Sequence, residues 1–198
     1  MPKVTEEHRA ARREQIVRAM LRCVAQDGFH RTTMAAVIRE SGLSAGAVYL
    51  YFRNKQDLIR AIAETAIADV AVVVEEAAEA EELPDPERVV LDLTQRIVDL
   101  GEAHGVELHR VALQTWAEAV RDPEVLEIAR GEAGRIAAAW VTYARRAIEA
   151  GFLPADAEPT RVARALMGLL PGFMLQRLVF PDVTPAAYAA GLGDLLRH

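Results

Sequence analysis

The most constraining feature of this 198-residue sequence is the stretch of residues 32–58, TTMAAVIRESGLSAGAVYLYFRNKQDL. Residues 34–40 have the apolar spacing of a short helix behind a pair of threonines, which are good helix caps. The segment SGLS interrupts this pattern, and residues 45–52 have the pattern of a second short helix. Helices this short are not stable alone in water, so they must pack against other elements. Two short helices joined by a tight, glycine-containing turn are typical of a helix-turn-helix, whose second helix enters the DNA major groove.

The rest of the chain has the 3.6-residue apolar spacing of further helices. We expect an all-α fold of about nine helices, over residues 5–27, 34–40, 45–52, 55–79, 86–104, 106–120, 124–150, 159–180 and from 185 onward. Residues 1–53 would form a three-helix head and residues 54–198 a larger helical body. Gly28 is expected to end the first helix. Pro171 is expected to kink the helix of residues 159–180, which is apolar on almost every face.

The charge is divided unevenly between head and body. The whole chain has a net charge of -6. Residues 1–60 nevertheless hold 11 Lys and Arg against 6 Asp and Glu, whereas residues 61–198 hold 12 against 23. A basic head on an acidic body indicates that the head meets phosphate and the body does not.

Several other classes of protein do not fit the sequence. No run of about 18 uncharged apolar residues suggests a membrane span, and the charged N-terminus lacks the apolar core of a signal peptide. The single cysteine, Cys23, excludes an intrachain disulfide and agrees with a reducing cytoplasm. The sequence contains no phosphate loop, nucleophile elbow or HExxH motif, and His104 and His109 are poorly spaced to share a metal. We therefore expect a cytoplasmic protein without catalytic residues, metal or cofactor.

The pattern Thr-Thr, Gly42-Leu43-Ser44-Ala45-Gly46, Val48-Tyr49-Leu50-Tyr51-Phe52, Asn54-Lys55 and Leu58 resembles the DNA-binding head of the TetR (tetracycline-repressor-like) family of transcriptional regulators. The match covers about residues 10–60. It implies DNA contacts by Thr33, Ser44, Ala45, Gly46, Tyr49, Tyr51 and Lys55, and Arg31 is a further candidate. Positions 45 and 47 are often Lys and Thr in relatives but are both Ala here, so the recognition helix has few hydrogen-bond donors. We expect modest direct base readout, phosphate contacts and some dependence on DNA shape.

The resemblance also implies that the body binds a small molecule and forms a homodimer. The candidates for a ligand site are His109, Leu113, Trp116, Trp140, Tyr143, Met167, Phe173 and Met174, although aromatic and Met residues at helical spacing more often fill a core. A largely apolar lining would favour a hydrophobic or aromatic effector. The last two helices of each subunit would form a four-helix dimer interface, with Arg164, Met167, Gly168, Gln176, Tyr188 and Leu192 as candidate contacts.

These observations predict a ligand-responsive transcriptional regulator that binds double-stranded DNA at a palindromic operator. The hypothesis we favour is a repressor that is released from DNA by a small, largely hydrophobic effector. The two recognition helices of the homodimer would lie about 34 Å apart. Ligand would tilt the helix that links body and head and so change this spacing. Two alternatives stay open, a helical protein or enzyme that uses the same body pocket, and a scaffold that uses its head for protein contact.

Overall fold

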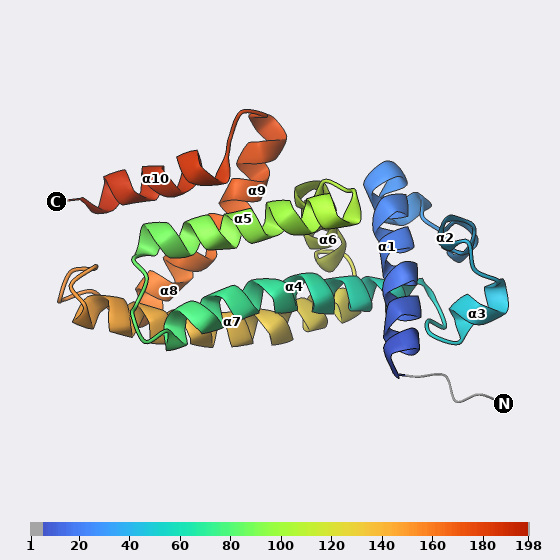
Figure 1. The fold of residues 1–198 in the computed structure, drawn as a ribbon, viewed down its shortest axis with the longest axis horizontal. Coiled ribbons are helices and arrows are strands. Elements are labelled where there is room, and N and C mark those ends of the chain that lie inside the picture. Colours follow the sequence, from blue (N-terminus) through green and yellow to red (C-terminus); the bar gives the residue numbers. More distant parts are fainter. Residues whose placement is uncertain (1–5, 198) are drawn as a thin grey trace.

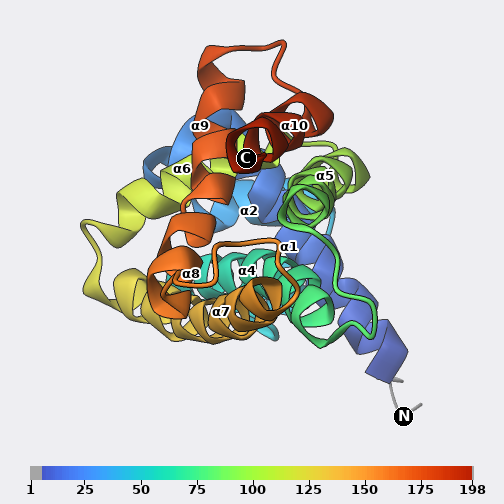
Figure 2. The ribbon, with the colours of Figure 1, turned by 90° about the vertical axis from the view of Figure 1, so that its left-hand side faces the viewer.

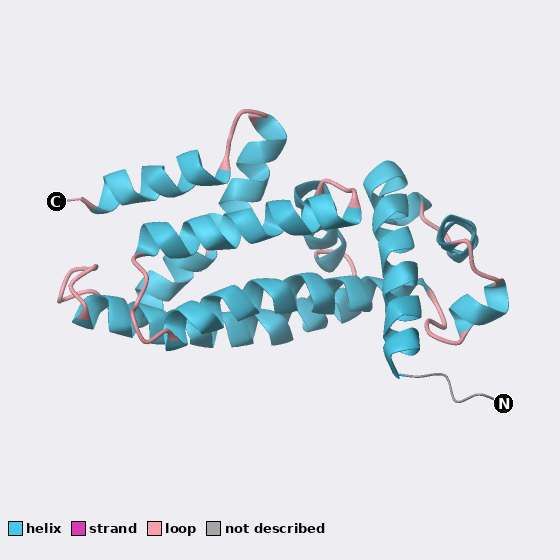
Figure 3. Ribbon diagram, viewed as in Figure 1, coloured by secondary structure: helices cyan, strands magenta, loops and turns pink. Residues whose placement is uncertain are grey.

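A computed structural model of the chain describes residues 6–197, except for the side chains of residues 63, 65–69 and 132. All regular structure in this part of the chain is α-helical, which confirms the predicted fold class (Figure 3). The first helix belongs to a small head and lies on the side of it that faces an elongated body (Figure 1). The described residues form ten helices, one more than expected, because the segment of residues 159–180 is divided in two.

The head consists of α1 (Glu6–Arg31), α2 (Met34–Ser41) and α3 (Ala45–Tyr49). Residue 5, where we expected the first helix to begin, lies outside the described residues. Gly28 interrupts the helical backbone of α1 with a φ of 77° and a ψ of 166°. The chain therefore turns at the predicted glycine, and the next residue, Phe29, is buried in the core.

The core of the head explains why its short helices hold together. Its buried side chains come from all three helices, from the loop after α3 and from the first turn of the next helix, namely Ile16, Met20, Val24, Phe29, Val37, Val48, Phe52 and Leu58. Val48 and Phe52 point inward as the apolar spacing predicts. Burial of such side chains is the main free-energy gain that stabilises elements too short to exist alone.

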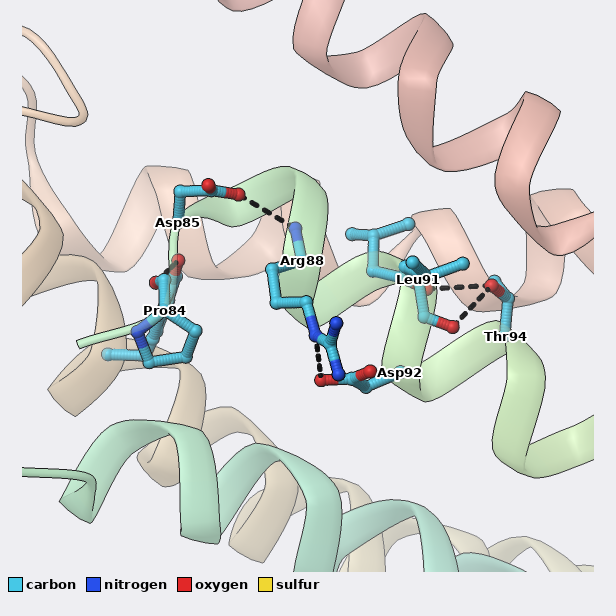
Figure 4. A network of polar contacts seen from close by, with 8 residues as sticks. Pro84, Asp85, Arg88, Leu91, Asp92 and Thr94 are labelled. Carbon is cyan, nitrogen blue, oxygen red and sulfur yellow. Dashed lines mark hydrogen bonds and ion pairs between the residues drawn. The ribbon is translucent and has the colours of Figure 1, made fainter. Parts of the chain in front are cut away.

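The body begins with α4 (Lys55–Glu79), which leaves the head and runs beside α7 (Pro123–Glu149) in Figure 1. Above this pair lies α5 (Pro86–His104), and α6 (Leu108–Ala119) packs against α1 at the end nearest the head. The start of α5 is capped by the carboxylate of Asp85, which accepts the Arg88 N–H at 2.8 Å (Figure 4). The body helices thus begin close to the residues that the sequence predicts.

The last three helices are α8 (Pro159–Met167), α9 (Leu169–Val179) and α10 (Pro185–Leu196). Figure 2 shows α8 and α9 crossing the body, and α10 returns to pack against α5. By length and composition alone, the 21 residues 159–179 would be apolar enough to span a membrane, and 28% of the 18-residue window that passes this test is buried within the chain. Leu175, Leu178 and Val179 are exposed apolar side chains near its end.

The predicted disruption by Pro171 is seen as an interruption of the helix at Gly168, three residues before the proline. Proline has no N–H, so Pro171 cannot donate to the carbonyl of Met167, and its ring crowds that carbonyl. With the break at Gly168, Pro171 falls in the first turn of α9, where an N–H would have no partner within the helix. The break therefore precedes the proline by three residues.

Candidate DNA-binding face and ligand cavity

The turn between α2 and α3 is held by local hydrogen bonds and by one long-range contact. Gly42 has a φ of 68° and donates its N–H to the carbonyl of Arg39. The Ser41 hydroxyl donates to the Ile38 carbonyl at 2.9 Å and accepts the Leu43 N–H at 3.3 Å. Gln15 of α1 donates its side-chain amide to the Ser41 carbonyl at 2.7 Å. The first helix is thus tied to the end of α2, where the turn begins.

Two hydroxyl groups cap the helices on either side of this turn. Thr33 accepts the Ala36 N–H and Ser44 accepts the Ala47 N–H, each at 3.2 Å. Both capping residues are exposed. A hydroxyl oxygen that accepts from the helix can still donate its own hydrogen to a phosphate. The geometry therefore allows both residues to meet the DNA backbone.

The outer face of α3 is small and mostly apolar. Ala45 and Gly46 are exposed, and Tyr49 is 49% exposed. The helix ends at Tyr49, earlier than predicted, and the next residue, Leu50, is 84% exposed. Tyr51 is half-buried and packs on the core. Leu50 is thus the more accessible neighbour of Tyr49, a distinction that helical spacing could not make because the helix had already ended.

The two predicted cations, Arg31 and Lys55, both bind backbone carbonyls within the head. Arg31 is exposed and its Nε donates to the Asp27 carbonyl at 3.0 Å. The ammonium of Lys55 donates to the Phe29 carbonyl at 2.6 Å, so this side chain ties the start of α4 to the end of α1. An ammonium has three hydrogens, so this bond leaves Lys55 able to donate to a phosphate as well.

A cavity of about 220 Å³ lies inside the body, between α4, α5, α6, α7, α8 and α9. The indoles of Trp116 and Trp140 and the thioethers of Met167 and Met174 form part of its wall, and aliphatic residues form most of the rest. Thr115 contributes a hydroxyl, which donates to the Val111 carbonyl at 2.9 Å and keeps its lone pairs available. No charged side chain lines the cavity among the described residues. Trp116, one of the wall residues, is itself 51% exposed.

Four of the eight candidate ligand residues line this cavity, and the other four lie outside its wall. Phe173 and Tyr143 are fully buried in the surrounding core, and Tyr143 donates its hydroxyl to the Pro84 carbonyl at 2.9 Å. Burial raises the pKa of this phenol well above its usual range. His109 faces a different pocket at the start of α6, and Leu113 lines neither space. Sequence reasoning missed Ala112, Ala129 and Ala133, whose small side chains leave room for the cavity.

The candidate dimer residues lie on or beside the exposed apolar surface of the last helices. Arg164, Gly168 and Gln176 are exposed, and Leu192 is half-buried. Two others have roles within their own chain, since Met167 lines the cavity and Tyr188 donates its hydroxyl to the Leu169 carbonyl at 2.7 Å. Around them are exposed apolar side chains, namely Leu175, Leu178, Val179, Phe180 and Leu195.

Polar residues at the end of α6 and just after it touch the head, and the sequence did not point to them. The Nη1 atom of Arg121 lies 3.0 Å from Nε2 of His30, and a carboxylate oxygen of Glu118 lies 3.9 Å from the same nitrogen. Glu118 is on the helix that also carries Thr115, Trp116 and other residues of the cavity wall. One face of α6 therefore lines the cavity while its end contacts the head.

The head is basic and contains two short helices joined by a tight turn, and the body contains an apolar cavity. These features define a helix-turn-helix DNA-binding regulator with room for a small molecule. Comparison with known families agrees with this class. Residues 16–62 match the model of bacterial regulatory proteins of the tetR family, and residues 86–198 match the C-terminal model of BetI-type transcriptional repressors. The chain belongs to the TetR family of transcriptional regulators, whose members are DNA-binding proteins and not enzymes.

Individual relatives place the similarity along the chain. The uncharacterized HTH-type transcriptional regulator YfiR of Bacillus subtilis is 44% identical over 66 residues, so this match spans only 33% of the chain and 32% of the relative. The HTH-type transcriptional regulator TtgR of Pseudomonas putida is 26% identical over 195 residues, covering 92% and 87% of the two chains. The solved structure of Salmonella enterica GusR has a TM-score of 0.76 at 25% identity and covers 98% and 96%.

Proposed function

We propose that this protein is a cytoplasmic repressor that binds a palindromic operator as a homodimer and releases it when a small, neutral, largely apolar molecule fills the body cavity. The observation that carries the proposal is the cavity wall, in which Thr115 and the two tryptophans are the only described residues with a polar side-chain group. Burying a charged ligand there would leave the charge unpaired, at a large free-energy cost. The match to BetI-type repressors supports repression rather than activation.

The exposed apolar surface of α8, α9 and α10 supports the homodimer. A patch of this kind on an isolated subunit would favour association, and a twofold contact buries the same patch on both copies. The twofold axis would set two α3 helices about 34 Å apart, one DNA turn, and so select a palindromic site. Thr33, Ser44, Tyr49 and Lys55 would contact phosphate, while Ala45 and Leu50 would contact thymine methyl groups.

The position of α6 supports the coupling between effector and DNA. Filling the cavity would favour one arrangement of α6 and α4, and both helices contact α1 of the head. A ligand that prefers one body state by about 1–3 kcal/mol would change operator affinity several-fold to about a hundredfold. A solved structure of similar fold supports an apolar effector class, because SmeT, which has a TM-score of 0.74 and 22% identity, was solved in complex with triclosan.

The proposal is tested by operator release. Duplexes that the protein selects from a random pool would supply an operator. The fluorescence anisotropy of this labelled operator would then report protein binding while neutral aromatic compounds are added. We expect a subset of these compounds to lower operator affinity, whereas choline, a quaternary ammonium ion of the kind that aromatic cages bind, should have no effect. Failure of every duplex to bind at low salt would overturn the regulatory role itself.

A matched pair of variants on α6 separates the cavity from the DNA-binding face. Ala112 lines the cavity and Ala117 is exposed on the same helix. Ala112→Leu should fill part of the cavity and weaken the effector response, measured against the variant's own operator affinity without effector, at least about tenfold. Ala117→Leu should behave as the wild type. An effector response that survives Ala112→Leu unchanged would place the ligand elsewhere.

A further inference from the structure

A second cavity, of about 270 Å³, lies where α5 ends and α6 begins, with α9 on its other side. It shares the apolar residues Ile97 and Leu108 with the first cavity, but its remaining wall is chemically different. Glu102, Glu107, His109 and Arg177 all line it, and we call it the His109–Arg177 pocket. The proposed repressor mechanism makes no use of these polar groups.

His109 is a buried polar side chain that has found no hydrogen-bond partner. It is 7% exposed, and among the described residues no hydrogen bond reaches its ring. Its Nε2 lies 3.9 Å from a carboxylate oxygen of Glu107, which is beyond hydrogen-bond distance. The ring lines the pocket, so a ligand or water there can complete its hydrogen bonding.

The second feature of the pocket is the guanidinium of Arg177 on α9. It lies over the Phe173 ring, 5.8 Å from the ring centroid, and no carboxylate of the described residues is within ion-pair distance of it. The neighbouring cation is different, because Arg110 pairs with Glu107 at 2.7 Å. The pocket therefore contains one guanidinium whose charge is not offset by a bound carboxylate.

The third feature is the start of α6. Glu107 occupies the capping position but makes no side-chain hydrogen bond to the first turn. The N–H groups of Leu108 and His109 therefore have no capping side chain, at the end of the helix where the peptide dipoles favour an anion. Together with the imidazole and the guanidinium, these groups present hydrogen-bond donors from two helices to one space.

We propose that the His109–Arg177 pocket binds a small monocarboxylate. A carboxylate would accept two parallel hydrogen bonds from the planar guanidinium and further bonds from the imidazole and the first turn of α6. The carboxylates of Glu102 and Glu107 stand in the same wall and oppose every negative charge on a ligand, so a ligand with two such charges is disfavoured more than one with a single charge. The apolar side of the pocket, formed by Ile97, Val98 and Leu108, suits a short hydrocarbon tail.

The test compares a carboxylate with a neutral molecule of the same shape. The His109 ring signals of isotope-labelled protein, assigned with a His109→Gln variant, would be followed by NMR while butanoate or butanamide is added at constant pH and ionic strength. Butanoate should shift these signals with a saturating curve, and butanamide should not. Absence of any shift with butanoate, or an equal response to butanamide, would overturn the proposal.

Variants of the guanidinium test its role directly. Arg177→Gln should weaken butanoate binding at least about tenfold because a charged hydrogen-bond pair is lost. Arg177→Lys keeps the charge without the planar donor pair, so its affinity for butanoate should lie between those of the wild type and Arg177→Gln. This variant would also replace Arg177→Gln in the test if Arg177→Gln did not fold. The control Arg130→Gln, on α7, should bind as the wild type. Unchanged affinity in both Arg177 variants would refute the site, and because no DNA is present this outcome is independent of the proposed repressor function.

Discussion

The guanidinium of Arg121 lies 3.0 Å from the imidazole Nε2 of His30, although 91 residues separate them in the chain. This contact joins the segment that follows α6 to the end of α1, where the head begins to turn. His30 is largely exposed, so a pair of this kind contributes little to stability, about 1 kcal/mol or less. The junction between head and body is therefore held mainly by the apolar packing of α1 on α4 and α6, and this polar pair adds little to it.

The first prediction concerns Gly28, which lies two residues before His30. Its φ of 77° and ψ of 166° fall in a region that only glycine adopts readily, and a Cβ there would lie 3.4 Å from the side-chain oxygen of Gln114. Gly28→Ala should lower the free energy of unfolding by about 1–3 kcal/mol. Urea denaturation followed by circular dichroism would measure this change.

The control for this variant is Gly131→Ala, inside α7, where a Cβ would meet nothing within 4 Å. Alanine is the better helix former, so this change should raise the free energy of unfolding by about 1 kcal/mol at most. Equal effects of the two substitutions would contradict the strain assigned to Gly28.

The head could be predicted from sequence because its signals are local. Ser44 caps α3, Gly42 turns the chain and Val48 faces the core, and each follows from its immediate neighbours. The cavity could not be predicted in the same way. Trp140 and Tyr143 lie three residues apart on one helix and look alike in sequence, yet only Trp140 borders the cavity, because the difference is set by what other helices place opposite each side chain.

The same limit applies to the pocket at the start of α6. His109 and Arg177 are distant in sequence and come together only through the packing of α6 on α9. No periodic pattern marks such a pair. The break at Gly168 could be predicted only in part. The missing N–H of Pro171 requires an interruption upstream of the proline, but the sequence does not say at which residue it falls.

The second prediction concerns phosphate contact by Lys55. Lys55→Ala should weaken binding to every duplex alike and lower the slope of log affinity against log salt by about one. The variant also loses the bond to the Phe29 carbonyl, so its unfolding must be measured beside its binding. The control is Arg88→Ala, which also removes one positive charge but at the start of α5 in the body. It should leave the slope of log affinity against log salt unchanged. Loss confined to one base position would indicate base reading by Lys55.

The third prediction concerns the apolar surface of the last helices. Leu175→Glu places a charge where a leucine is 52% exposed on α9, and the variant should sediment as a monomer at micromolar concentration. Operator affinity should then fall about a hundredfold or more, because the second half-site is no longer tethered to the first. Val120→Glu alters a side chain that is 85% exposed near the head and should leave the dimer intact. Dissociation by both variants would mean that charge alone disrupts assembly.

The last prediction is a pH dependence of stability that arises from His109. Burial lowers the pKa of this imidazole below its usual value, and Arg177 and Arg110 act in the same direction while Glu107 opposes them. The folded protein therefore keeps His109 neutral, whereas the unfolded chain takes up a proton below a pH of about 6.5. The contribution of His109 to stability is complete above that pH and is lost as the pH falls through the lowered pKa of the folded state.

Urea unfolding measures this effect. Between about pH 7.5 and 5, the free energy of unfolding should decline less for His109→Gln than for the wild type. Parallel curves would mean that His109 takes up its proton equally in both states, and added butanoate should reduce the wild-type decline because a bound carboxylate stabilises the imidazolium.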